Sequence, residues 1–283
     1  MKVTEEKWMS TNHKNQFENI FKSFDAKCRP YSLFSDFCTM AAASLSNSTR
    51  QFQETEIVER RESEYEECAK RYDKGEMEKM AHLLGAVTMA LEENPDQDFL
   101  GDIYMSLDFG NARTGQYFTP YPISKMMAQM NLENAPSLLK TQRYISICDP
   151  CAGGGGMLIA AFNAAKDMGI NPQTQCLFHG CDIDGVVLRM AYIQCSLLGM
   201  CGHFIHGNSL SLEEWSSFTT PLYHINRWRF GRNDEPGEIA MPMTVMEEKR
   251  IGMEAPPEAV PDSPGTAVLP DEHHEEGSRY AAV

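Results

Sequence analysis

The 283-residue sequence contains no apolar run near the roughly eighteen residues that a membrane-spanning helix needs. Its first residues, MKVTEEKWMSTNHKNQ, lack the apolar core of a secretory signal peptide, so we expect a cytoplasmic location. Basic residues are also few, since 25 Lys and Arg stand against 40 Asp and Glu and give a net charge of −15. Lys and Arg supply most non-specific affinity for phosphates, and their scarcity argues against a protein that binds nucleic acid by itself.

Cysteines are too scattered to build a disulfide framework. There are nine of them, an odd number, spread through expected helices and strands. Cys148 and Cys151 form a C-x-x-C pair, but the pair straddles an expected strand end and a turn, whereas the thioredoxin-like redox motif opens a helix. We therefore interpret these cysteines as buried, reduced thiols rather than as a redox or zinc site, and we predict no metal site.

The negative charge is concentrated at the C-terminal end. Residues 231–283 hold twelve acidic and four basic side chains, are rich in Pro, and contain almost no aromatic residues. This composition is typical of a disordered segment, and we predict an acidic, Pro-rich, disordered tail over residues 231–283. The preceding part of the chain is only mildly acidic, which leaves room for a local basic groove.

The first part of the chain predicts helices. Phe17, Ile20, Phe21 and Phe24 recur at helical spacing, and a second apolar helix is expected over residues 32–45, after Pro30. Residues 55–94 indicate two more helices with a break near Gly75. We predict a helical N-terminal region over residues 1–110, with its Phe and Met side chains in the core.

Residues 111–230 predict strands that alternate with helices. Short β-rich runs at residues 144–149, 176–184 and 203–208 are separated by two helical segments. This alternation indicates an α/β fold with a parallel sheet, in which ligands bind at the carboxyl ends of the strands. Residues 219–231 could add one edge strand.

A glycine run lies at the end of the first predicted strand, in DPCAGGGGML. The run matches neither G-x-G-x-x-G nor the phosphate loop, which requires Lys-Ser or Lys-Thr after its last glycine. A sharp turn without Cβ atoms nonetheless lets a cofactor lie against the backbone, with the carboxylate of Asp149 beside it. Taken alone, a purely structural turn is an open alternative.

The next two strands end in polar side chains. Asp182 follows the second strand, where a carboxylate can accept hydrogen bonds from both hydroxyls of a ribose. Asn208 ends the third strand, where an amide oxygen can accept from the amino group of an adenine. The three strand ends together predict a site for an adenosine cofactor without a pyrophosphate.

Four motifs in order, TGQYFTP, DPCAGGGGML, GCDIDGVVLRMA and GNSL, resemble those of the adenine-N6 DNA methyltransferases. The resemblance is to the modification subunits of type I restriction systems and their phage and plasmid relatives, and covers about residues 100–210. It implies a Rossmann-like methyltransferase fold over residues 111–230 that binds S-adenosylmethionine. It also implies site-specific methylation of adenine N6 in double-stranded DNA, with DNA contacts supplied by a separate specificity subunit.

The resemblance also implies roles for individual residues. It assigns a methionine-binding segment, a glycine-rich turn, an acid on the ribose, an aliphatic contact to the adenine ring and an acceptor for the adenine amino group. The methionine-binding segment is Tyr117, Phe118, Thr119 and Pro120, and the glycine-rich turn contains Asp149, Ala152, Gly153 and Gly155. Asp182 is the acid on the ribose, Ile183 contacts the adenine ring, and Asn208 accepts from the adenine amino group. Asp184 is better interpreted as the cap of the following helix.

One motif of the family is missing. Its enzymes carry Asn-Pro-Pro-aromatic after the fourth strand, where the target amino group is held and the flipped base is stacked, and this sequence contains no such run. Thr220, Pro221 and Tyr223 keep one proline and one aromatic and are the candidate catalytic residues, although Thr cannot reproduce the geometry of the amide acceptor. An ordinary loop is the alternative interpretation of this segment.

The later strands and a target-recognition domain are also unrecognisable, which suggests a shortened methyltransferase whose sheet is incomplete. Three hypotheses follow: a DNA adenine-N6 methyltransferase; a catalytically weak or inactive cofactor-binding relative acting as a regulatory or anti-restriction partner; and a methyltransferase for small molecules or proteins. The missing acceptor motif and the acidic charge weigh against the first, the shortened sheet favours the second, and the TGQYFTP likeness argues against the third.

Overall fold

A computed structural model describes residues 13–25, 29–109, 117–226 and 280–282. The helices of the N-terminal region are α1 (His13–Lys22), α2 (Pro30–Asn47), the short 3-10 helix η2 (Arg50–Phe52), α3 (Thr55–Ala69), α4 (Lys74–Glu93) and α5 (Phe99–Ser106). They confirm the helical region that the apolar spacing predicts. The break before α4 falls at Asp73, whose side chain accepts from the Glu76 N–H in a capping box.

A five-stranded sheet follows, with the order β4-β3-β2-β1-β5. Its strands are β1 (Ile145–Asp149), β2 (Cys176–Asp182), β3 (Gly202–Asn208), β4 (Glu213–Thr219) and β5 (Tyr280–Ala282). The first three strands and β5 are parallel, whereas β4 is antiparallel to β3. The predicted α/β class with a mostly parallel sheet is therefore confirmed.

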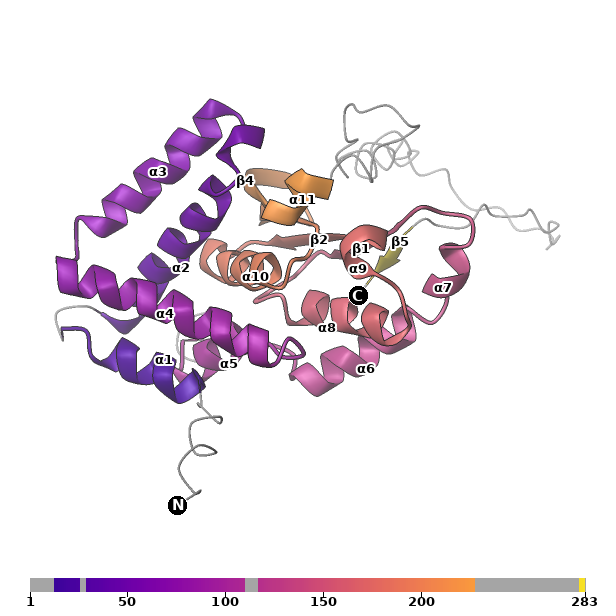
Figure 1. Cartoon of the computed structure of the whole chain (residues 1–283), viewed down its shortest axis with the longest axis horizontal. Helices are drawn as coiled ribbons and strands as arrows, with labels where there is room; N and C mark the ends of the chain where they lie inside the picture. The colour runs from indigo at the N-terminus through magenta and orange to yellow at the C-terminus, as the bar shows by residue number, and fades with distance from the viewer. Residues whose placement is uncertain (1–12, 26–28, 110–116, 227–279, 283) are drawn as a thin grey trace, which may run out of the picture.

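Two helices cover one face of this sheet: α8 (Gly156–Asp167) follows β1, and α10 (Gly185–Leu197) follows β2 (Figure 1). Phe178 of β2 packs against Phe162 of α8, and Phe204 of β3 packs against Tyr192 of α10. The remaining helices are α6 (Tyr121–Asn131), α7 (Ala135–Leu138), α9 (Pro172–Gln175) and α11 (Pro221–Asn226). Both crossover helices are rich in alanine and aliphatic residues, as burial between two layers requires.

The N-terminal helices pack on the outer side of α10. Figure 1 places α2, α4 and α5 beside this helix. The helix itself is buried around most of its circumference, because Val187, Tyr192 and Gln194 are all fully buried although they point in different directions. One continuous core therefore joins the helical region to the sheet.

One expectation about the end of the chain is corrected by these elements. Residues 221–226 form helix α11 instead of an edge strand, because Pro221 opens a helix readily at its first position. Residues 280–282, within the predicted disordered tail 231–283, form β5 beside β1. The rest of that tail lies outside the described residues. No helix in the described part of the chain is long and apolar enough to cross a membrane.

Candidate functional site

The glycine turn connects β1 to α8 at the carboxyl edge of the sheet. Gly153 and Gly155 adopt positive φ angles of 53° and 90°, a region that side chains disfavour. A Cβ on Gly155 would stand 3.0 Å from the Ala191 backbone, so the missing side chain also lets α8 approach α10. The turn thus has a structural reason as well as a ligand-binding one.

A small pocket of about 90 Å³ opens against this turn. It brings together six residues that the sequence predicts for the cofactor, namely Tyr117, Phe118, Thr119, Asp149, Ala152 and Gly153. The ring of Phe118 lies 5.3 Å from that of Tyr104, and it contacts the open side of Gly153. Pro120 lies at the N-cap of α6, just beyond this group. The predicted methionine-binding segment and glycine turn therefore share one pocket.

Two carboxylates hold the turn. Asp149 is buried and accepts from the Cys151 N–H at 3.0 Å. Burial raises its pKa, the Cys151 hydrogen bond opposes this rise, and the nearby charge of Asp182 adds to it. Asp182 accepts from the Gly153 N–H at 2.8 Å and from the Asp184 N–H at 2.9 Å. It therefore ties the end of β2 to the glycine turn, and its remaining lone pairs are available to a ligand.

The other predicted rim residues lie further along the same edge. Asp184 caps α10 as predicted, accepting from the N–H groups of Val186 and Val187. Ile183 is exposed beside it. The amide oxygen of Asn208 accepts from the N–H groups of Leu210 and Ser211, so it organises the β3–β4 turn. The sequence prediction assigned this oxygen to an adenine amino group, and the structure already engages it in the turn.

The candidate catalytic residues lie at the opposite edge of the sheet. Because β4 is antiparallel to β3, it returns the chain to the amino ends of the strands, and Thr220, Pro221 and Tyr223 follow there. Thr220 is fully buried, donates to the Met200 carbonyl and accepts from the Gly202 N–H. Tyr223 is buried against Leu177 and Cys201. The structure thus places the three candidate catalytic residues away from the glycine turn.

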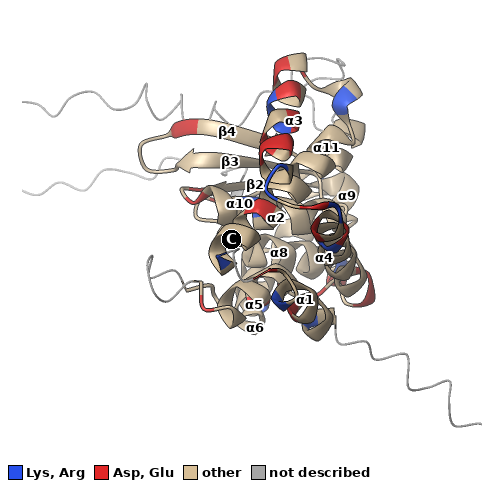
Figure 2. Ribbon diagram, turned by 90° about the vertical axis from the view of Figure 1, so that its left-hand side faces the viewer, with Lys and Arg blue, Asp and Glu red and all other residues tan. Residues whose placement is uncertain are grey.

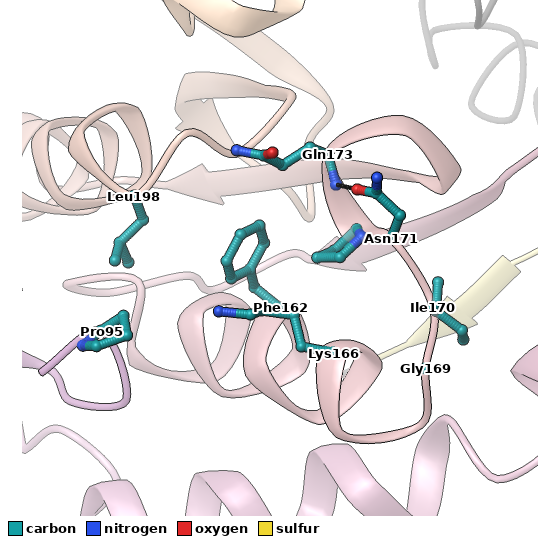
Figure 3. A pocket seen from close by; sticks show the side chains of 9 residues that line it. Pro95, Phe162, Lys166, Gly169, Ile170, Asn171, Gln173 and Leu198 are labelled. Atoms are coloured by element: carbon teal, nitrogen blue, oxygen red, sulfur yellow. Dashed lines mark hydrogen bonds between the residues drawn. The ribbon is translucent and has the colours of Figure 1, made fainter. Parts of the chain in front are cut away.

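A larger cavity of about 490 Å³ lies at this amino edge, between the end of α8 and α9 (Figure 3). Figure 3 shows the Asn171 side chain accepting from the Gln173 N–H beside it. Lys166 is the one charged residue among its described lining. The cavity is far from the glycine turn along the strands, and we therefore do not assign the cofactor to it despite its size.

Sequence reasoning missed two polar side chains that line the glycine-turn pocket, Asp98 and Ser124, and a third residue behind them, Gln194 of α10. The Gln194 amide donates to the Asp98 carboxylate at 2.8 Å and to the Gly154 carbonyl at 2.9 Å, and its oxygen accepts from the Leu100 N–H. None of the three residues belongs to a glycine motif or a strand end. The available signal was that Asp98 stands three residues before Gly101, the spacing at which an N-cap side chain accepts from a backbone N–H.

The pocket fits the amino-acid end of S-adenosylmethionine. It offers two carboxylates, Asp98 and Asp149, for an ammonium group, and the first turn of α8 for a carboxylate. Asp182 and Ile183 lie along the same edge, where ribose and adenine would follow.

Lys and Arg do not gather on one side of the ribbon in the view of Figure 2. Lys and Arg are interspersed with Asp and Glu along α3 and α4, and the β4 strand carries acidic residues. Among the described residues, groups of three or more His, Cys, Asp or Glu that could hold a metal are absent.

Three solved structures resemble this fold. The methyltransferase subunit of a type I restriction-modification system from Streptococcus thermophilus is 16% identical with a TM-score of 0.37, covering 72% of this chain and 59% of its own. A protein assigned as a class I S-adenosylmethionine-dependent methyltransferase from Listeria monocytogenes is 14% identical with a TM-score of 0.34, over 70% and 55%. A modification subunit assigned to a type I restriction enzyme from Vibrio vulnificus is 20% identical with a TM-score of 0.27, over 47% and 24%. This chain thus spans little more than half of the first two.

A family model matches directly. The model described as N-6 DNA Methylase covers residues 95–227, which begin just before Asp98 and α5 and end just after α11. The match includes the whole glycine-turn pocket and strands β1 to β4. Residues 95–227 of this chain are therefore similar to the N-6 DNA methylase family.

Proposed function

We propose that this chain transfers the methyl group of S-adenosylmethionine to adenine N6 in DNA, as part of a restriction-modification type of system. The observation that carries the proposal is the convergence of Tyr117, Thr119 and Asp149 on one pocket at the glycine turn, inside the segment that matches the family. The cofactor supplies an activated methyl group when bound. The residues of this chain hold it in place beside the carboxyl edge of the sheet.

The residues around the pocket act by positioning. Asp149 and the turn amides fix the amino-acid end, Asp182 accepts from the ribose hydroxyls, and Ile183 covers one face of the adenine. The target base would enter from the same edge, after leaving the DNA stack. With a net charge of −15, the chain needs a partner subunit to supply most of the phosphate contacts. Both the DNA partner and the subunit partner are part of the proposal.

A second candidate function is supported by the positions of the residues that were predicted to bind the target base and the adenine amino group. Thr220, Pro221 and Tyr223 lie at the amino edge, and the Asn208 amide oxygen is engaged in a turn. Among the described residues, no Asn-Pro-Pro-aromatic run stands at the carboxyl edge. A cofactor-binding relative with weak or no transfer activity, acting as a regulatory or anti-restriction partner, would have this arrangement.

Calorimetric titration with S-adenosylmethionine and transfer of tritiated methyl to DNA that lacks adenine methylation test both candidates. We expect the wild-type chain to bind the cofactor and Asp149→Asn to bind it at least about tenfold more weakly, since it loses a buried charge contact. Asp102→Asn, an exposed acid on α5, is the matched control. Label recovered as N6-methyladenine supports the enzyme. Cofactor binding without label supports the second candidate, and a folded chain that binds no cofactor contradicts both.

A further inference from the structure

A serine in the cofactor pocket has a buried hydroxyl without a partner. Ser124 of α6 is fully buried and lines the glycine-turn pocket. Among the described residues, nothing forms a hydrogen bond with its Oγ. Helical Ser and Thr usually donate to the carbonyl four residues earlier, as Thr39, Ser44 and Thr88 do in this chain. A buried hydroxyl left unpaired costs about 1–3 kcal/mol, so this group indicates a missing ligand.

A buried carboxylate lies in the same pocket. The Oδ1 atom of Asp98 accepts from the Gly101 N–H and from the Gln194 amide, which caps α5 and fixes the side chain. If Gly156 carried a side chain, its Cβ would lie 2.8 Å from the Asp98 Oδ2 atom. A Cβ on Gly154 would lie 3.7 Å from the same atom. These two glycines therefore leave room for the Asp98 carboxylate at the start of α8.

The charge of the pocket selects a cation. Asp98 and Asp149 are its charged lining residues, and its described lining contains no Lys or Arg. Burial raises the pKa of Asp98 to about 6, against the hydrogen bonds from Gln194 and Gly101, and the nearby charge of Asp102 adds to the rise. The Asp98 carboxylate is therefore still ionised near neutral pH, and the described lining of the pocket holds no basic side chain to neutralise it. An ammonium group, with three N–H donors, would satisfy it.

The first turn of α8 supplies the complementary feature. Gly155 at its N-cap provides no side-chain oxygen, and Gly156 and Met157 line the pocket. The first amides of this twelve-residue helix have no intrahelical partner and favour an anion. A ligand group that carries an ammonium and a carboxylate on one carbon matches both features within about 90 Å³.

We propose that Asp98 and Ser124 bind the amino-acid end of the cofactor, with Asp98 accepting from its ammonium group and Ser124 donating to its carboxylate. This inference rests on the proposed function and deepens it. It means that the cofactor site includes the segment before α5, outside the sheet and its strand ends. The fixed contacts of Gln194 then serve to hold Asp98 in position.

Two cofactor analogues, one with and one without the amino-acid end, provide the test. S-adenosylhomocysteine keeps the amino-acid end, whereas 5′-methylthioadenosine lacks it. We expect Asp98→Asn to weaken S-adenosylhomocysteine by about tenfold or more and Ser124→Ala by about threefold to tenfold, measured by calorimetry. The affinity for 5′-methylthioadenosine should change by less than about twofold in either variant. Asn retains an oxygen for the Gly101 N–H, and the exposed pair Glu133→Gln and Ser137→Ala are the controls.

A pH titration gives a second readout. Wild-type affinity for S-adenosylhomocysteine should fall as the pH drops below about 6, because the pKa of Asp98 is raised to about 6 and the protonated acid cannot pair with an ammonium. Asp98→Asn should show a smaller pH dependence. Equal losses for both ligands, or no loss for S-adenosylhomocysteine, would overturn the inference. A wild-type chain that binds neither ligand would instead overturn the proposed function.

Discussion

Four consecutive glycines follow Ala152, and each has its own physical reason to lack a side chain. Gly153 and Gly155 have positive φ angles, Gly154 lies against Met190, and Gly156 leaves room for Asp98. The run is therefore explained by backbone conformation and by packing on three separate elements.

A pair of substitutions can separate the cost of backbone strain from the cost of close packing. Gly169 has a φ of 76° and open space around it, whereas Gly155 has a φ of 90° and the Ala191 backbone 3.0 Å from its would-be Cβ. We expect Gly169→Ala to cost about 1–2 kcal/mol of unfolding free energy through backbone strain. Gly155→Ala should cost about 1–3 kcal/mol more through overpacking. Urea denaturation measures both, and equal losses would contradict the close approach of α8 and α10.

A second prediction concerns two buried histidines on β2 and β3. His179 and His203 are paired across the strands, and His179 Nδ1 and both nitrogens of His203 have no hydrogen-bond partner among the described residues. Burial, reinforced by His203, lowers the pKa of His179 to about 3, and burial also lowers that of His203. Below pH 6.5 the unfolded chain binds protons that the folded chain does not, so folding stability falls as the pH drops from 6.5 toward 3.

We expect each histidine to contribute a slope of up to about 1.4 kcal/mol per pH unit in this window. Asp98 acts in the opposite direction between about pH 4 and 6, because its pKa is raised, so the total pH dependence mixes the two. Comparing wild type with His179→Leu by urea denaturation at several pH values isolates the histidine. The exposed His82→Leu is the control. A constant stability difference from pH 7 to pH 4 would show that His179 is not the group that titrates.

Residues near strand ends were predictable, and residues placed by tertiary packing were not. Asp149, Asp182 and the glycine turn follow directly from a parallel sheet. Asp98 and Ser124 reach the pocket from helices, and no periodicity marks them as different from other helical polar residues. The position of Thr220 and Tyr223 at the amino edge could not be predicted, because the sequence does not reveal that β4 reverses direction.

At the scale of elements, the same contrast holds for strands. The predicted runs 144–149, 176–184 and 203–208 became β1, β2 and β3 with shifts of one or two residues, because buried parallel strands are continuously apolar. β4 (EEWSSFT) is polar over most of its length and was missed. β5 has three residues in an acidic, Pro-rich context, too short for any pattern.

Helix α3 is joined to β4 by one buried arginine. The Arg61 side chain is 1% exposed, lies 3.5 Å from the Phe218 ring centroid, and donates to the Ser217 carbonyl at 2.8 Å (Figure 1 places α3 beside β4). We expect Arg61→Ala to destabilise the protein by at least about 2 kcal/mol, since it removes a desolvated cation–π contact and leaves a carbonyl unpaired.

The neighbouring Arg60 provides the control, because it is exposed on the same helix and its substitution by Ala should cost within about 0.5 kcal/mol. Arg61→Lys should fall between the two, since Lys keeps the charge but not the planar stacking. Thermal and urea unfolding of the three variants give the comparison. Similar losses at both positions would mean that α3 does not depend on Arg61. The sequence RR could not indicate which arginine faces inward.

For the whole molecule, the sequence predicted separate regions, 1–110 and 111–230, on the basis of a change in pattern. The described helices and sheet nevertheless share a single core that includes Phe37, Leu100 and Phe178. Gln194 also links the segment before α5 to the glycine turn. The change from helices to alternating strands thus marks a change in topology. It does not divide the chain into two units that fold separately, because both regions share this core.

A truncation tests how far this coupling extends. A chain of residues 111–283 would lack α2, α4 and α5, which pack against α10, and would lose Asp98 from the glycine-turn pocket. We expect this fragment to lack a cooperative thermal transition and to bind S-adenosylhomocysteine no better than the background. Deletion of residues 1–12, which precede α1, is the control and should leave both properties unchanged. A folded fragment that retained cofactor affinity would show that the helical region is an independent addition and would also remove Asp98 from the site.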